Sequence, residues 1–347
     1  MQPPHLHASA ILRAVALSLF FCLTAPTPST AAAETSLPWT LSAYLENDLF
    51  TGTDRNYTNG VKLSLISPDL YSFVESGKLP EWSLPYIHQL PFINDPDPLV
   101  TRRVEFSLGQ NMYTPADISR SDLIADDRPY AGWSYFGAGF HTRIGNRMDT
   151  IELQLGLIGP ESFAEETQKG VHDLRNLQRP NGWDHQLKNE PGLAAIYERK
   201  WRLAPFFSKN NFEMDAITHL GCALGNVATY ANSGMETRLG WNLPEDFGVS
   251  LIRPAGSTRF ATRKNRGGHL FAAVNGRAVL QDIFLDGNTF AHSHSVEKKP
   301  FVADLAGGAA FYFNQFKLTL SQILRTKEFR GQSDSHSFGS ITLSFFF

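Results

Sequence analysis

A short stretch near the start of the chain crowds oxygen-bearing side chains around a turn. Residues 44–60 read Tyr-Leu-Glu-Asn-Asp-Leu-Phe-Thr-Gly-Thr-Asp-Arg-Asn-Tyr-Thr-Asn-Gly, which is typical of a strand, a turn and a second strand. Across this hairpin mouth, the Asp48 carboxylate, the Asn47 carboxamide and the Thr58 hydroxyl can face one another. Hard oxygen ligands on one loop suit calcium. The same residue types are ordinary in turns, so the motif alone favours a metal site and a plain turn equally.

A second polar stretch, residues 171–191, contains a candidate general base. His172 can take a proton from water because imidazole titrates near neutral pH. A single histidine in a polar loop is more often simply solvated. Trp183 and Leu187 need apolar partners, which indicates a specifically packed loop.

The segment 110–133 offers basic and aromatic candidates. Arg120 or Arg128 could contact a phosphate or stabilise an oxyanion. Alternatively, Arg128 pairs with a neighbouring aspartate. For Tyr130 and Trp133 we favour a place in an aromatic girdle at the membrane surface.

Composition and charge narrow the class of protein. The 347 residues carry a net charge of −3 and 12% aromatic residues. Residues 1–33 combine Arg13, a short apolar run and Ala31-Ala32-Ala33, which predicts a signal peptide followed by a domain over 34–347. The slightly negative net charge is not typical of a nucleic-acid-binding protein. The predicted mature domain keeps only Cys222, so an internal disulfide is excluded.

The last residues favour a transmembrane β-barrel over a soluble all-β protein. Residues 339–347 alternate so that Ile341, Leu343, Phe345 and Phe347 share one face of a strand. Together with the signal peptide, this predicts an antiparallel outer-membrane barrel of about twelve strands with long extracellular loops. The expected strands are 39–46, 57–66, 103–110, 132–142, 150–158, 193–203, 212–220, 223–230, 268–280, 301–313, 315–324 and 339–347.

Parity assigns the connections to the two sides of the membrane. If both chain ends face the periplasm, the first, third and fifth connections are extracellular, and these are 48–56, 113–127 and 160–191. They hold most of the candidate chemistry. The long segment 67–101 fits less well as a periplasmic turn, so either it is an ordered turn against the rim or the strand count is wrong there.

These motifs, taken in order, resemble the outer-membrane lipid A 3′-O-deacylase family over essentially the whole mature chain. The matching elements are Glu46-Asn47-Asp48, Asp54-Arg55-x-Tyr57-Thr58-x-Gly60, Gln110-x-x-Tyr113-x-Pro115, Asp127-Arg128, Ile158-Gly159-Pro160, His172 with Trp183-x-x-Gln186, and Glu328-Phe329-Arg330.

The resemblance implies a calcium-dependent hydrolase that removes an ester-linked acyl chain from lipid A in the outer leaflet. Asn47, Asp48 and Thr58 match family active-site positions, and His172 matches the proposed general base. Near Arg120 the family pattern can carry a lysine. Where a family member can present a glutamate to the metal, this chain has Gln178, whose amide oxygen can still ligate calcium.

The resulting hypothesis is an enzyme that acts on lipopolysaccharide. Calcium near Asp48 polarises the ester carbonyl, and His172 activates water. We expect a monomer among outer-membrane lipids, with no nucleic-acid partner. The alternatives are a phospholipase with a serine nucleophile such as Ser119, Ser121 or Ser293, a non-enzymatic pore or adhesin, and an inactive relative of the deacylases.

Overall fold

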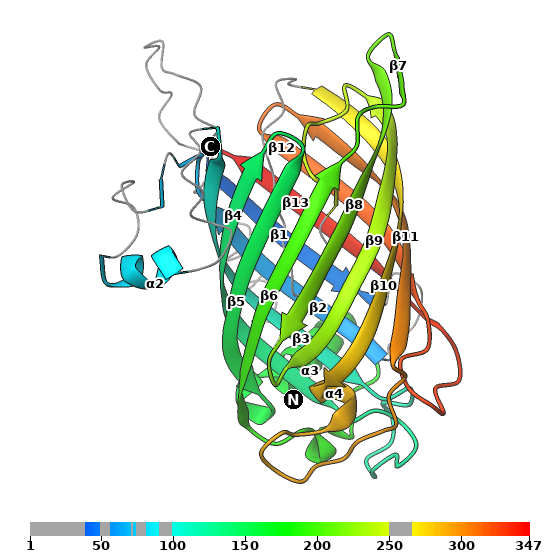
Figure 1. Cartoon of the computed structure of the whole chain (residues 1–347). Helices are drawn as coiled ribbons and strands as arrows, with labels where there is room; N and C mark the ends of the chain where they lie inside the picture. Colours follow the sequence, from blue (N-terminus) through cyan, green and yellow to red (C-terminus); the bar gives the residue numbers. More distant parts are fainter. Residues whose placement is uncertain (1–38, 49–55, 71, 74–80, 90–98, 250–265) are drawn as a thin grey trace, which may run out of the picture.

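The computed structural model is a closed antiparallel β-barrel (Figure 1). The residues it describes are 39–48, 56–70, 72–73, 81–89, 99–249 and 266–347. The expected signal peptide and most of the first turn, residues 49–55, lie outside them.

Twelve long strands form the wall in the described part of the chain. They are β1 (Thr40–Asn47), β2 (Asn56–Ile66), β3 (Thr101–Thr114), β4 (Ala131–Ile144), β5 (Arg147–Ile158), β6 (Glu190–Arg202), β8 (Phe212–Leu224), β9 (Ala228–Trp241), β10 (Arg266–Asp282), β11 (Phe301–Phe313), β12 (Phe316–Arg325) and β13 (His336–Phe346). The short β7 (Phe207–Lys209) pairs only with β8. The helical segments are η3 (Glu81–Ser83), α2 (Leu84–Gln89), η4 (Pro160–Ser162), α3 (Ala164–Arg175), η5 (Trp183–His185) and α4 (Ile283–Asp286).

The barrel closes because its first and last strands pair. Thr40 of β1 lies opposite Phe346 of β13, and β6 pairs with β8 on the far side. Neighbouring strands otherwise follow the order of the chain. The prediction of a twelve-stranded antiparallel barrel is confirmed.

One of the predicted strands was wrong. The range 223–230 covers the end of β8, a turn and the start of β9, whereas β9 itself is Ala228–Trp241. Inward positions of β9 such as Asn232 and Glu236 are polar, and the outward Ala231 and Ser233 are small, so the alternation is too weak to mark this strand.

Side chains alternate between a polar interior and an apolar exterior. Inside, the Lys62 ammonium lies 3.1 Å from the Glu105 carboxylate, and both side chains are almost fully buried. Outside, Leu108 and Leu343 are exposed. Ile341, Leu343 and Phe345 do share the outer face of β13, as predicted. A soluble protein has apolar residues inside and polar residues outside. The opposite arrangement found here is the one that a barrel in a bilayer requires.

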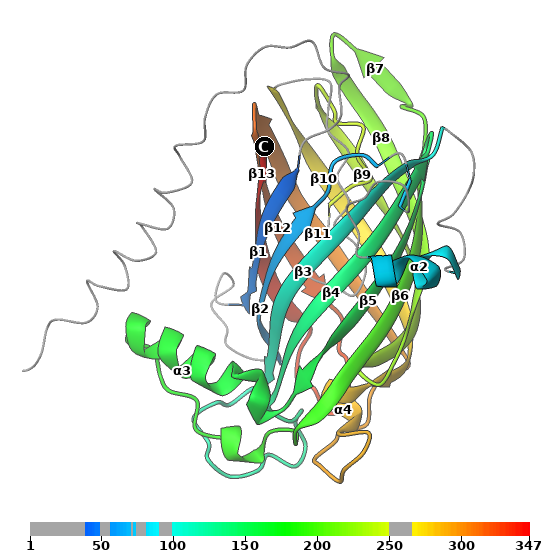
Figure 2. The same ribbon diagram turned by 90° about the vertical axis from the view of Figure 1, so that its left-hand side faces the viewer.

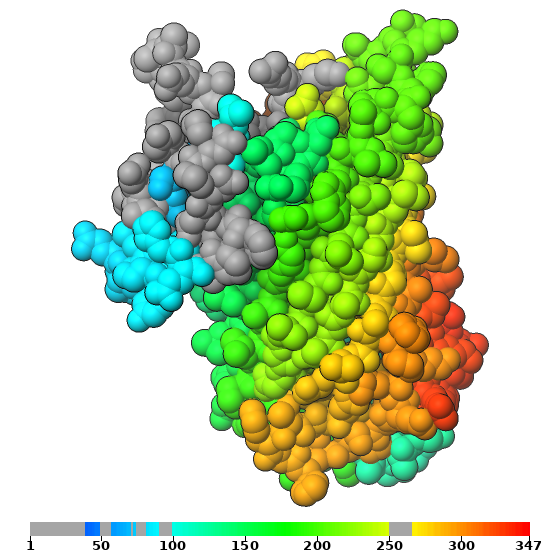
Figure 3. All heavy atoms as spheres, in the orientation of Figure 1, coloured from blue at the N-terminus to red at the C-terminus, as the bar shows by residue number. Residues whose placement is uncertain are grey.

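The long connection 67–101 contains no strand in its described residues, so the strand count was not wrong there. It carries α2, which stands on the outer side of the barrel (Figure 3). Ile87 packs with Leu70, Phe73, Val104 and Phe140. The described part of this connection therefore lies against the outer wall, whereas residues 71, 74–80 and 90–98 lie outside the described residues.

Among the described residues, no helix is both long enough and apolar enough to cross a bilayer.

The end of β1, the start of β2 and the β3–β4 and β5–β6 connections lie at one end of the barrel, together with α3 and α4 (Figure 1). The C-terminus and the β7–β8 turn lie at the other end. The apolar α4 packs in the mouth, where Ile283, Phe284 and Leu285 are all buried and Phe284 stacks on Tyr113. The predicted connections 113–127 and 160–191 therefore share one side, and most of the first, 48–56, lies outside the described residues.

Replacing Leu108 with Arg should destabilise the barrel by about 2–4 kcal/mol, because Leu108 is 62% exposed near the middle of β3 and would place a charge in hydrocarbon. Urea unfolding in lipid vesicles, followed by tryptophan fluorescence, measures the change. Leu108→Phe is the matched control and should unfold like the parent protein. Equal stability of the Arg and Phe variants would contradict the assignment of this face to lipid.

Candidate active site

The helix α3 packs on the outer face of β3 and β4, not inside the barrel. Gln110 Nε2 and Ser134 Oγ, which both point outward, each donate a 2.7 Å hydrogen bond to the Ser162 carbonyl in η4. A Cβ on Gly132 would lie only 2.2 Å from the Cβ of Ala164, so glycine is needed for this close approach. The wall itself therefore fixes the start of α3.

One face of α3 is buried, and it carries the candidate base. Ala164, Gln168 and His172 recur at every fourth position and are the buried residues of the helix. In Figure 2, α3 begins beside the wall at the lower end of the barrel and extends away from it, on the side of β1 and β2. His172 thus belongs to the face that turns toward the protein.

The connection that follows α3 is packed as its aromatic content predicted. Trp183 and Leu187 are fully buried, and Trp183 Nε1 donates a 2.8 Å hydrogen bond to Gln168 Oε1. The Leu187 amide donates to the carbonyl of Tyr130. The third and fifth connections therefore form one packed unit beneath α3.

The end of α3 holds the imidazole of His172 in one orientation. The chain reverses at Asn176, in the left-handed conformation, and brings the Gln178 carbonyl onto His172 Nδ1. A carbonyl oxygen only accepts, so Nδ1 must carry the hydrogen in this contact, and Nε2 is then the nitrogen of a neutral ring that can accept a proton. The ion pair of Asp173 with Arg179 ties the same turn.

That ion pair lies in solvent. The hydrogen bond from Arg179 lowers the pKa of the Asp173 carboxyl below its ordinary value. The turn therefore keeps its charged tie at neutral pH.

The mouth of the first hairpin brings Asn47 and Thr58 onto the outer wall. Asn47 is on the outward face of β1 by the alternation of that strand, and it lies opposite Asn59. Thr58 is the extra residue of a bulge, and its hydroxyl lies 2.7 Å from that of the outward-facing Thr114. Asp48, directly after β1, is fully buried.

The two candidate arginines are already engaged by carboxylates. Arg120 forms an exposed ion pair with Asp122. Arg128 is buried, stands 4.7 Å from the ring centre of Tyr113, and donates a 3.2 Å hydrogen bond to Glu328. The alternative, in which the Arg128 side chain pairs with a neighbouring aspartate, is wrong, because the side chain bonds to Glu328 and only the backbone amide bonds to Asp127.

A buried charge cluster inside the mouth was missed. Glu328 contacts Arg128 and Arg325, and Arg325 also binds Asp304. Burial alone would raise the pKa of Glu328, but Arg325 and Arg128 lower it below its ordinary value. The motif containing Glu328 was visible in the sequence, yet only the fold brings it to Arg128, 200 residues away.

The girdle assignment of Tyr130 and Trp133 was wrong. Both are buried, with Tyr130 against Trp183 and Trp133 stacked on Tyr135 inside the wall. Trp133 occupies an inward position of β4, which the sequence pattern could not assign without the strand register.

The described residues do not form a complete calcium site. No group of three or more His, Cys, Asp or Glu side chains in the described ranges is arranged to hold a metal ion. Gln178 has an exposed side chain, and its carbonyl is bonded to His172. Asp48 and Gln178 by themselves are too few oxygen donors for calcium, which takes six to eight.

Comparison with known proteins identifies the family. The family model described as outer membrane protein LpxR matches residues 15–347. This chain belongs to the LpxR family. The family resemblance inferred from the motifs is confirmed, and the barrel is an outer-membrane protein.

One solved structure shares the fold of this LpxR-family chain. LpxR from Salmonella typhimurium is 20% identical, covers 89% of this chain and 100% of its own, and superposes with a TM-score of 0.71. The β domain of the Bordetella autotransporter Brka is 10% identical, covers 90% of this chain and 100% of its own, and has a TM-score of 0.42. No curated protein sequence matches.

Replacing Glu328 with Gln should destabilise the protein by about 3–5 kcal/mol, because Arg128 and Arg325 would lose their buried carboxylate. Glu297→Gln is the matched control. Glu297 pairs with Arg330 in solvent, and its loss should cost less than about 1 kcal/mol. Urea unfolding in vesicles compares the two, and equal effects would contradict a structural role for the cluster.

The same carboxyl predicts a dependence on pH. The pKa of Glu328 is lower in the folded protein than its ordinary value of 4.5. Its contribution to stability is therefore complete above that value and is lost as the pH falls through the lower folded pKa. Unfolding measured between pH 7 and pH 3 should show this loss in the parent protein, and a smaller loss in the Glu328→Gln variant.

Proposed function

We propose that this LpxR-family protein is a lipid A deacylase, a carboxylic ester hydrolase that removes the 3′-O-linked acyl chain in the outer leaflet. The observation that carries the proposal is the position of the candidate residues. Asn47, Thr58 and the face of α3 that holds His172 belong to the outside of the wall, at one rim. A lipid can reach such a site from the bilayer without entering the barrel.

The free face of α3 fits the same membrane setting. Leu174 is 61% exposed and lies on the side away from the buried stripe, and Phe163, directly before the helix, is 64% exposed. Apolar side chains on a helix beside the rim favour contact with acyl chains. We infer that this end of the barrel is extracellular and that α3 lies at the surface of the outer leaflet.

In the proposed reaction, His172 Nε2 takes a proton from a water molecule whose oxygen attacks the ester carbonyl carbon. Asn47 and Thr58 orient the water or the ester. The bond from the carbonyl carbon to the sugar oxygen then breaks, and the proton passes from His172 to that oxygen. The products are a fatty acid and a free sugar hydroxyl. For Arg120 or Arg128 to bind the substrate's charge, each would have to exchange its carboxylate partner for it.

Calcium dependence is proposed from the family resemblance. Calcium would supply charge that polarises the ester carbonyl. Asp48 is the one candidate ligand at the hairpin mouth whose carboxylate is buried in the described structure. The donors described here do not make a full site, so we assign no reaction step to the metal. The monomeric state likewise stays a prediction.

The alternatives find less support. In the described part of the chain, none of Ser119, Ser121 and Ser293 is hydrogen-bonded to a histidine. The Ser119 hydroxyl donates to Asp117, and that of Ser293 accepts from a backbone amide. A pore is disfavoured by the interior, where a buried ion pair joins Lys62 of β2 to Glu152 of β5.

Replacing His172 with Ala should lower the deacylation rate about 10²–10⁴-fold, the usual contribution of a general base. Mass spectrometry of lipid A from cells that express the protein detects the loss of one acyl mass. His185→Ala is the matched control, because His185 is exposed on the same connection and should be dispensable. Undiminished activity of a folded His172→Ala variant would refute the assigned role.

A calcium titration of the Gln178→Ala variant separates two possible roles of Gln178, orientation of His172 and binding of the metal. If its carbonyl only orients His172, Gln178→Ala should keep both activity and its response to calcium, since the backbone contact remains. If its amide oxygen binds the metal, the variant should need more calcium. Titrating calcium after chelation, with acyl loss as the readout, decides between them. Activity unaffected by chelation would contradict calcium dependence altogether.

A further inference from the structure

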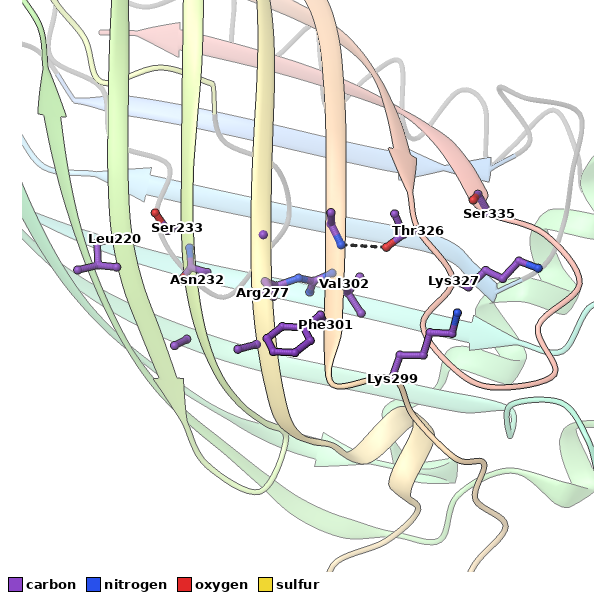
Figure 4. Close-up of a pocket in the computed structure, with 14 residues that line it drawn as sticks. Leu220, Asn232, Ser233, Arg277, Lys299, Phe301, Val302, Thr326, Lys327 and Ser335 are labelled. Carbon is purple, nitrogen blue, oxygen red and sulfur yellow. Dashed lines mark hydrogen bonds between the residues drawn. The ribbon is translucent and has the colours of Figure 1, made fainter.

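The outer wall carries a hollow on β9, β10 and β11, near their ends on the α4 side. Its volume is about 730 Å³, within the range of about 300–1,000 Å³ that is usual for sites that bind small molecules. It is separate from the candidate active site, since α3 packs against β3 and β4. Figure 4 shows the residues that line it.

Small outward-facing residues make its floor. Ser233, Gly276 and Ala303 lie opposite one another across β9, β10 and β11. The next row toward the loops continues with Ala231 and Ala278. Five small residues on three adjacent strands leave the backbone close to the surface at this place.

Apolar side chains form the walls. Phe301 is 73% exposed and Leu220 is 55% exposed, and both line the hollow. On the side toward the middle of the barrel, Met235, Val274 and Leu305 form a continuous exposed row. A chain lying in the hollow would therefore continue onto an apolar surface that faces hydrocarbon.

The rim is basic. Lys299 and Lys327 lie beside each other at one end of the hollow, and Leu220 lies at the other (Figure 4). The Lys327 ammonium donates to the Ser333 carbonyl, whereas that of Lys299 has no hydrogen bond or ion pair to any described residue. None of the described lining residues is acidic, and the hydroxyls of Thr326 and Ser335 add possible donors.

We propose that this hollow binds one anionic, phosphate-bearing lipid of the leaflet that meets this end of the barrel. The acyl chain lies over the small-residue floor between Leu220 and Phe301, and the phosphate lies between Lys299 and Lys327. The charge of the rim and the continuity with the lipid-facing wall specify this occupant. A soluble anion would make no contact with the apolar walls. A neutral lipid would bring no negative charge to pair with the two lysines.

Native mass spectrometry of the purified full chain in mild detergent tests the proposal. The probes are phosphatidylglycerol and phosphatidylcholine with identical acyl chains, so the result does not depend on whether the protein deacylates lipid A. We expect one phosphatidylglycerol to remain bound preferentially. Replacing both Lys299 and Lys327 with Ala should weaken the binding of phosphatidylglycerol about thirty-fold, because two lysines near an anionic headgroup would be lost.

A second variant tests the floor. Ala303→Trp fills the hollow and should abolish the preferential binding, although its side chain points to lipid and leaves the interior untouched. Ala272→Trp, outward on β10 but outside the hollow, and Lys209→Ala, at the opposite end, should bind like the parent protein. Equal binding of the two lipids, or unchanged binding in both the lysine and the Ala303→Trp variants, would overturn the proposal.

Discussion

Hydrocarbon offers no hydrogen-bond partner, so every backbone group of a chain that crosses a bilayer must be paired within the protein. The ladder between β1 and β13 meets this requirement by closing the sheet. Closure leaves one face for lipid and one for the lumen, and polar side chains belong inside. A polar site on the outer face can exist only near a rim, where another part of the protein shields it from hydrocarbon. The bulge at Thr58 and the packing of α3 provide such a place.

The lumen follows from the same constraint. Charges inside are buried, and each costs free energy unless it is compensated. Arg128 and Arg325 converge on Glu328, and this joins the β3–β4 connection to the β12–β13 connection. Together with α4 in the mouth, the cluster fixes the connections relative to the wall. The geometry of the rim therefore depends on interactions that contain none of Asn47, Thr58 and His172.

Much of the fold could be predicted because side chains in a barrel strand point alternately to lipid and to the lumen. In eleven of the strands, apolar and polar residues alternate clearly with this period of two. The exception, β9, has polar residues facing inward and small residues facing outward. The site was predictable only as a set of local motifs. The Gln178 carbonyl on His172 arises from a reversal at Asn176, and the contact of Arg128 with Glu328 joins distant segments. Neither contact leaves a local periodic signal, and without the register Trp133 could equally have faced lipid.

The position of the proposed site outside the barrel also has an energetic reason. Moving an acyl chain from the bilayer into water costs about 0.8 kcal/mol for each CH₂ group, so withdrawing a chain of ten carbons would cost about 8 kcal/mol. A site in the lumen would have to recover that cost by binding, yet this lumen is occupied by side chains. A site on the wall leaves the chain in hydrocarbon and exposes only its ester to the polar rim. The substrate's own partition into the membrane then holds it beside His172, and the protein needs to orient only one carbonyl and one water.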